Sequence, residues 1–125
     1  MILLLFGSSS IKLISNKKYV FTGQKNYPSK RDGDVVVITV DYSPILASGE
    51  TITKTEWKVG LVSGTDRNPN NMVKELSTQD GNKILQKIGG GITGNIYSPY
   101  CVATTSKGQV LSMPPSKFGL LAIES

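Results

Sequence analysis

The sequence predicts an all-β fold, a sandwich or barrel of short strands. Turn-forming residues such as Ser48-Gly49, Asp80-Gly81 and Lys107-Gly108 recur about every eight to twelve positions. The runs between them are rich in β-branched and aromatic residues, and no segment has a sustained helical period. A single domain of 125 residues is long enough to bury a core without metals or disulfides.

Short strands are expected between the turns, and within residues 70–79 the pattern also permits one helical turn. The segment 34–42 is apolar on both faces, with Val36, Ile38 and Val40 on one of them, which predicts a central strand. The full set of expected strands is 2–6, 10–14, 18–22, 34–42, 51–59, 71–77, 83–88, 95–105, 109–113 and 118–123.

The segment 51–59 alternates as a half-buried strand does. Thr53, Thr55, Trp57 and Val59 share one face, and charged residues share the other. Trp57 is therefore expected to make the largest single contribution to the core.

The segment 95–105 reads as a long late strand. Tyr97, Cys101 and Ala103 are expected to point inward, and Pro99 predicts an edge or a bulge. A tryptophan on one strand and a Gly-x-x-Tyr leading into a later one are typical of immunoglobulin and fibronectin type III sandwiches, in which a corner tyrosine bonds back across a connection. Tyr97 is the expected corner tyrosine.

Gly89-x-Gly91-x-x-Gly94 has the spacing of a dinucleotide-binding loop. That loop must open a helix, whereas here β-forming residues and Pro99 follow. The next acidic residue after Asp80 is Glu124, so no carboxylate stands where a ribose needs one. A glycine-rich turn leading into a strand is the preferred interpretation, and no cofactor is expected.

The residue inventory argues against an enzyme. The chain has no histidine, which excludes Ser-His-Asp and Cys-His mechanisms, and its single cysteine, Cys101, is expected to be a small core residue. Ser-x-x-Lys occurs at Ser9 and Ser15 without a helix to carry it, and the pair Asp32 and Asp34 reads first as part of a turn. No catalytic, metal-binding or cofactor-binding residue is therefore proposed.

Residues 1–29 are expected to be an N-terminal extension, an apolar strand plus a basic arm, ahead of a sandwich domain at 30–125. The opening Met1–Phe6 is too short for a signal peptide or a membrane span, so no targeting segment is expected. Ile2, Leu4 and Phe6 either face a partner or complete the chain's own sheet.

The net charge of +5 comes from the first quarter of the chain, because six bases precede the first acidic residue. The stretch from Lys12 to Arg31, with aromatic residues interleaved, is compatible with a nucleic-acid-binding module. A solvated charged face is the preferred interpretation, because the bases have no regular period. Lys17 and Lys18 are the bases expected to contact a partner.

Several short motifs between Lys30 and Ser112 resemble a family of small phage virion proteins with an immunoglobulin-like fold, described as fibre-tail adaptor or head-tail accessory proteins. Residues 1–29 lie outside the pattern, and the end from Met113 lacks the polar alternating last strand of that family. The matching positions are Asp32, Asp41-Tyr42, Leu46, Gly49-Glu50-Thr51-Ile52, Trp57, Gly89-Gly90, Gly94, Tyr97 and Thr105-Ser106-Lys107-Gly108.

The resemblance implies a non-enzymatic assembly protein of the neck, tail or fibre-attachment region, present in multiple copies and bound to other virion proteins. Capsid decoration is the alternative within the same class, and nucleic-acid binding through Lys12 to Arg31 is the alternative from another class. Synthesis in the host cytoplasm and a final location in the virion follow. No small-molecule substrate or membrane partner is expected.

Overall fold

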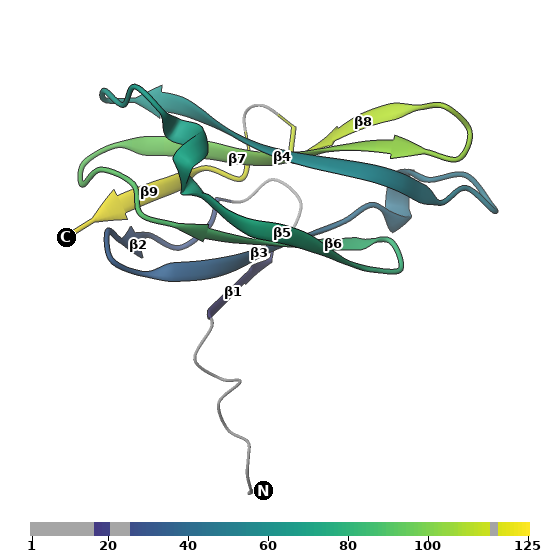
Figure 1. Cartoon of the computed structure of the whole chain (residues 1–125), viewed down its shortest axis with the longest axis horizontal. Coiled ribbons are helices and arrows are strands. Elements are labelled where there is room, and N and C mark those ends of the chain that lie inside the picture. The colour runs from purple at the N-terminus through teal and green to yellow at the C-terminus, as the bar shows by residue number, and fades with distance from the viewer. Residues whose placement is uncertain (1–16, 21–25, 116–117) are drawn as a thin grey trace, which may run out of the picture.

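The computed structural model describes residues 17–20, 26–115 and 118–125, which form two β-sheets packed face to face (Figure 1). One sheet has the order β1-β3-β6-β5, and the other has the order β2-β9-β7-β4 with β8 paired to β7. The all-β class and the sandwich architecture are thereby confirmed. The strands are β1 (Lys17–Val20), β2 (Lys30–Arg31), β3 (Val35–Asp41), β4 (Ile52–Ser63), β5 (Val73–Asp80), β6 (Lys83–Gly89), β7 (Ile96–Thr105), β8 (Val110–Met113) and β9 (Leu121–Glu124).

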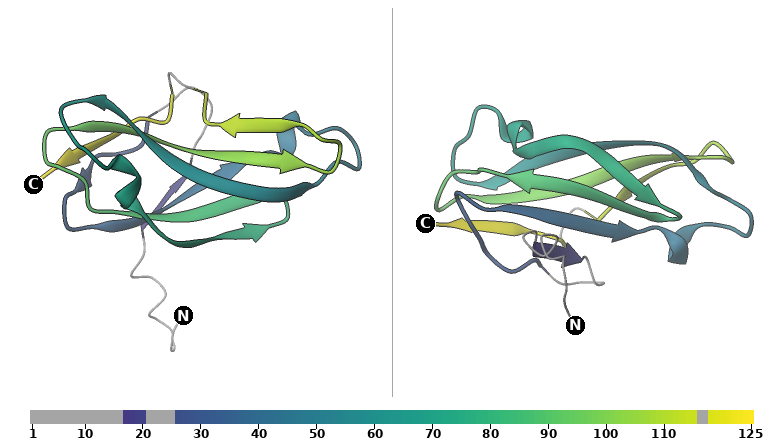
Figure 2. Two further views of the ribbon diagram at one scale, coloured as in Figure 1. Left: turned by 45° about the horizontal axis from the view of Figure 1, so that its top comes forward. Right: turned by 60° about the horizontal axis from the view of Figure 1, so that its bottom comes forward.

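Both sheets are mixed. β3, β6 and β5 are antiparallel neighbours, and β4, β7, β8 and β9 form the antiparallel part of the other sheet. β1 runs parallel to β3 and β2 runs parallel to β9, so each of these short strands adds a parallel edge (Figure 2). β3 is central, between β1 and β6, as its two apolar faces indicate.

The core lies between the two sheets and follows the period-2 alternation of the strands. Val36, Ile38 and Val40 of β3 face Trp57 of β4 and the inward side of β7, where every second residue from Tyr97 to Thr105 is buried. Each residue expected in the core is buried: Val36, Ile38, Val40, Trp57, Tyr97 and Cys101.

β4 departs from the expected alternation at its start. Ile52 pairs with Thr105 and Lys54 pairs with Thr104, so Thr53 is an extra residue in a β-bulge. The bulge turns Thr53 outward, where its side chain is exposed, and places Ile52 in the core. The expectation that Thr53 shares the inner face with Trp57 was wrong for this reason.

β7 as a whole lies inside the second sheet, but at Pro99 it is paired on one side only among the described residues, so the proline occupies a local edge. Pro99 stands opposite Val59 of β4, and the Val59 N–H points away from β7, to the Asn70 side chain. In an antiparallel pair of this kind, the nitrogen of the opposite residue points away as well, so the Pro99 nitrogen faces away from β4. On that outward side β9 pairs only with Ile96 and Tyr97, and β8 pairs only from Cys101 onward. The residue that has no N–H thus stands where β7 has no neighbour.

Three further differences concern short elements. Lys30–Arg31 forms β2, which was not among the expected strands. Pro69–Met72 forms a 3₁₀ turn, so β5 begins later than the strand expected at 71–77, and this turn overlaps the segment 70–79 in which a helical turn was permitted. Ser43–Ile45 forms a second 3₁₀ turn after β3. The strands expected at 2–6 and 10–14 lie outside the described residues.

Candidate docking surface

Two turns that are far apart in the sequence are joined at one end of the sandwich by a buried carboxylate. Gly49 adopts φ +79°, which allows the chain to turn just before Glu50. The Glu50 carboxylate accepts hydrogen bonds from the Ala47 N–H at 2.9 Å and from the Thr105 hydroxyl. The Gln109 side-chain amide also donates to it, at 2.9 Å. These hydrogen bonds, with that from Thr105 first, lower the pKa of Glu50.

The backbone completes this junction. Ser106 N–H donates to the Thr51 carbonyl at 2.8 Å, and Thr51 N–H donates to the Ser106 hydroxyl at 3.0 Å. The motifs Gly49-Glu50-Thr51-Ile52 and Thr105-Ser106-Lys107-Gly108 therefore form one unit, and their shared role is structural.

At the opposite end of β7, the glycine-rich segment is a turn that leads into a strand, as expected. Gly90, Gly91 and Gly94 all have positive φ, and β7 begins two residues after Gly94. Tyr97 ties this turn to its surroundings: its hydroxyl accepts the Ile92 N–H at 3.0 Å and donates to the Asp66 carboxylate at 2.7 Å. The hydroxyl therefore bonds back to the backbone five positions upstream.

A second tyrosine links the two sheets. Tyr42 follows β3 and is fully buried, and its hydroxyl donates to the Cys101 carbonyl at 2.8 Å. Burial raises the pKa of Tyr42, so the phenol stays protonated and remains a hydrogen-bond donor. The Asp41-Tyr42 pair is thus also structural, since Asp41 accepts the Ser43 N–H at 2.9 Å and ends the strand.

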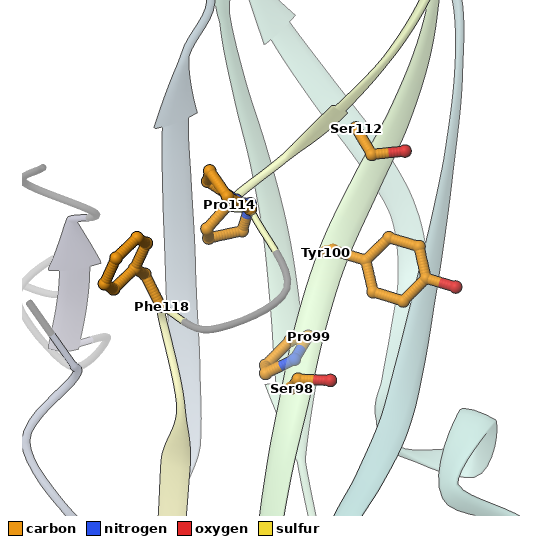
Figure 3. Close-up of a pocket in the computed structure, with 7 residues that line it drawn as sticks. Ser98, Pro99, Tyr100, Ser112, Pro114 and Phe118 are labelled. Carbon is orange, nitrogen blue, oxygen red and sulfur yellow. The ribbon is translucent and has the colours of Figure 1, made fainter. Parts of the chain in front are cut away.

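An apolar hollow lies beside the part of β7 that has no paired strand on that side among the described residues (Figure 3). Its volume is about 340 Å³. Pro99 lies on one side of it, and Pro114 and Phe118, from the connection between β8 and β9, lie on the other. Ser98, Tyr100, Ser112 and Pro115 complete the described lining, and no acidic or basic side chain is among these described residues.

The residues expected to contact a partner are only partly described. Ile2, Leu4 and Phe6 lie outside the described residues, and Lys17 and Lys18 pair through their backbones with β3 at the edge of the first sheet. Lys30, a base of the proposed nucleic-acid arm, is fully buried and donates to the Arg31 carbonyl at 2.6 Å. Lys30 is therefore not free to contact a phosphate.

The described part of the chain brings no group of three or more His, Cys, Asp or Glu side chains close enough to hold a metal ion. None of the helices within the described ranges has the length and apolar character needed to cross a membrane. Burial raises the pKa of the Cys101 thiol to about 11, so this sulfur is protonated at neutral pH and is a poor nucleophile.

The described residues thus form an all-β sandwich with an apolar hollow on its surface. The chain belongs to the family described as podophage GP4 fiber-tail adaptor protein gp77, whose family model matches residues 30–114. The resemblance inferred from the sequence motifs is confirmed by this match. No curated protein and no solved structure matches the chain.

Sequence reasoning missed the hollow itself. Pro99 indicated an edge or a bulge rather than one side of a hollow. A proline inside a long strand together with two prolines in the following connection is the local signal that was present.

Proposed function

We propose that this protein is a non-enzymatic adaptor that joins other virion proteins in the neck, tail or fibre-attachment region of a podophage particle. The family match carries the proposal, because residues 30–114 include both joined turn motifs, the Tyr97 turn and most of the apolar hollow. An apolar hollow with no charged side chain among its described lining residues is suited to binding a protein side chain rather than a small charged substrate.

We further propose that the protein acts in several copies arranged around the axis of the particle. A neck or tail has cyclic symmetry, and a protein that attaches fibres to it is repeated by that symmetry. The immunoglobulin-type assignment of the sandwich belongs to this proposal too. The return hydrogen bond of Tyr97 and the buried Trp57 support it.

Copy number in purified particles tests this function. Quantitative mass spectrometry gives the ratio of this protein to the portal protein. About six or twelve copies per particle are expected for a cyclic neck or tail structure. Hundreds of copies would instead indicate capsid decoration, and absence from the particles would refute a virion role.

We propose that Ile2, Leu4 and Phe6, with Lys17 and Lys18, contact other virion proteins. If residues 2–6 bind as a strand, alternate residues face the partner. Replacing Ile2, Leu4 and Phe6 by serine should then lower the copy number in particles. The matched control replaces Leu3 and Leu5, which share the other face. Equal losses in both variants would contradict a strand-like contact.

A further inference from the structure

Leu76 is the most exposed large apolar residue of the described chain, with 94% of its surface open to solvent. A single exposed leucine is ordinary on a protein surface. What distinguishes Leu76 is the local structure that holds it, because it lies in an irregular stretch of the edge strand β5. Three residues of β5, Glu75 to Ser77, stand opposite the single residue Gln86 of β6. Leu76 therefore lies in the middle of a bulge that interrupts the pairing of β5 with β6.

The bulge is strained and is fixed by specific contacts. Glu75 has φ +64°, the left-handed region that side chains with a Cβ rarely adopt. The buried Gln86 amide donates to the carbonyls of Lys74 at 2.7 Å and Glu75 at 3.1 Å. Glu75 also forms an ion pair with Lys87 at 3.3 Å. A buried amide and a strained backbone thus hold an apolar side chain in water, which indicates that the bulge has a use.

The hollow described above has the size and chemistry to receive this leucine. An apolar cavity of about 150 Å³ already binds benzene, which has more carbon atoms than a leucine side chain. The hollow is about 340 Å³, so it accommodates Leu76 with adjacent backbone. None of its described lining residues is acidic or basic, so at those residues the leucine displaces no water from a charge.

Leu76, called the knob from here on, and the hollow lie on opposite edges of the sandwich. β5, which carries Leu76, lies along β4, as the hydrogen bond between the Ser77 and Thr55 hydroxyls at 3.1 Å shows (Figure 1). The hollow borders the other side of β7, the side that faces away from β4 (Figure 3). A chain therefore cannot fill its own hollow with its own Leu76, but a neighbour placed edge to edge can.

We propose that Leu76 of one copy inserts into the hollow between Pro99, Pro114 and Phe118 of the next copy. The contact is heterologous, since a knob on one surface meets a receptor on a different surface, and repetition of such a contact closes a ring when the rotation allows it. This inference rests on the proposed assembly of several copies in the particle and names the surfaces that join them.

Cysteine cross-linking in particles tests the contact. Particles are produced with the double variant Leu76→Cys and Ser112→Cys, treated with a mild oxidant and dissociated without reductant. Ser112 is exposed at the rim of the hollow. A head-to-tail contact joins each copy to the next, so a ladder of covalent multimers is expected. Each single variant should remain monomeric.

A matched control pairs Leu76→Cys with Val62→Cys, an exposed apolar position on β4, and should give no ladder. Dimers from Leu76→Cys alone would overturn the proposal in favour of a symmetric contact. Normal copy number without a ladder would overturn it as well. Absence of the wild-type chain from the particles would instead refute the proposed function, so the two failures are distinguishable.

A second variant, Leu76→Ser, measures the strength of the contact. Its thermal unfolding should match that of the wild type, because the side chain touches little of its own chain. Its incorporation into particles should fall by about tenfold or more, which corresponds to the loss of one buried leucine per contact. Unchanged incorporation in competition with the wild-type chain would refute the role of Leu76.

Discussion

Replacing Tyr97 by phenylalanine should destabilise the fold by removing one hydroxyl and little else. The ring is fully buried, and the hydroxyl joins the turn at Ile92 to the carboxylate of Asp66. A hydrogen bond to a charged group is worth about 1.5–3 kcal/mol. The Ile92 N–H also loses its acceptor, but this site is only partly buried, so water replaces some of the loss.

The expected destabilisation is about 2–3 kcal/mol. A chain of this length shifts its Tm by about 4 °C per kcal/mol, so the Tm should fall by roughly 8–12 °C. Urea unfolding at neutral pH gives the free energy, with fluorescence as the readout, because Trp57 is the only tryptophan and is buried. The slope of the transition should not change, since the folded surface is the same.

Tyr100→Phe is the matched control, because that ring is half-exposed on the same strand, and it should change the stability by less than about 0.5 kcal/mol. A double-mutant cycle between Tyr97→Phe and Asp66→Ala should give a coupling of about 1–2 kcal/mol. An effect of Tyr97→Phe no larger than that of the control would refute the argument that this hydroxyl anchors the turn.

Three other predictions follow from single contacts. The pKa of Glu50 is lowered in the folded state, so its carboxylate stabilises the fold above its unfolded pKa near 4.5 and loses this effect as the pH falls through the folded pKa. Glu50→Gln should therefore weaken the dependence of the unfolding free energy on pH below about 4.5. An unchanged dependence in acid would contradict this prediction. The Cys101 thiol, with its pKa raised to about 11, should react with a thiol reagent at pH 8 only after unfolding in urea, and rapid labelling of the native protein would disprove its burial. Gly64→Ala should destabilise the fold more than Gly81→Ala by about 1 kcal/mol or more, as measured by thermal unfolding. Both residues have positive φ, but only at Gly64 would the added methyl group meet the Asn95 side chain, at 1.9 Å. Equal losses of stability in the two variants would contradict this clash.

Local patterns in the sequence predicted the parts of this fold that depend on local rules. Alternation along 34–42 and 95–105 identified the inward faces of β3 and β7, because side chains of a strand alternate wherever it lies. The same rule failed at Thr53, since one inserted residue shifts the alternation and the bulge depends on pairing with β7.

Contacts between distant segments could not be predicted in the same way. Glu50 reads as an ordinary surface acid, and its burial depends on Thr105 and Gln109, which the topology brings to it. Lys30 reads as part of a basic arm, but it is buried because β2 joins the second sheet beside β9. Leu76 and the proline-lined hollow escaped notice for the same reason, since their exposure is a property of the assembled sheets.

At Pro99 a neighbouring strand can leave β7 without leaving a backbone N–H of β7 unpaired. A chain that leaves a sheet in mid-strand normally abandons backbone hydrogen bonds, but the connection from Met113 to Leu121 leaves β7 beside a residue that has no N–H to lose. The backbone ladder on either side of Pro99 therefore does not depend on hydrogen bonds from that connection. A change of side chains at Pro114, Pro115 or Phe118 can alter the lining of the hollow while the hydrogen bonds of β7 stay intact.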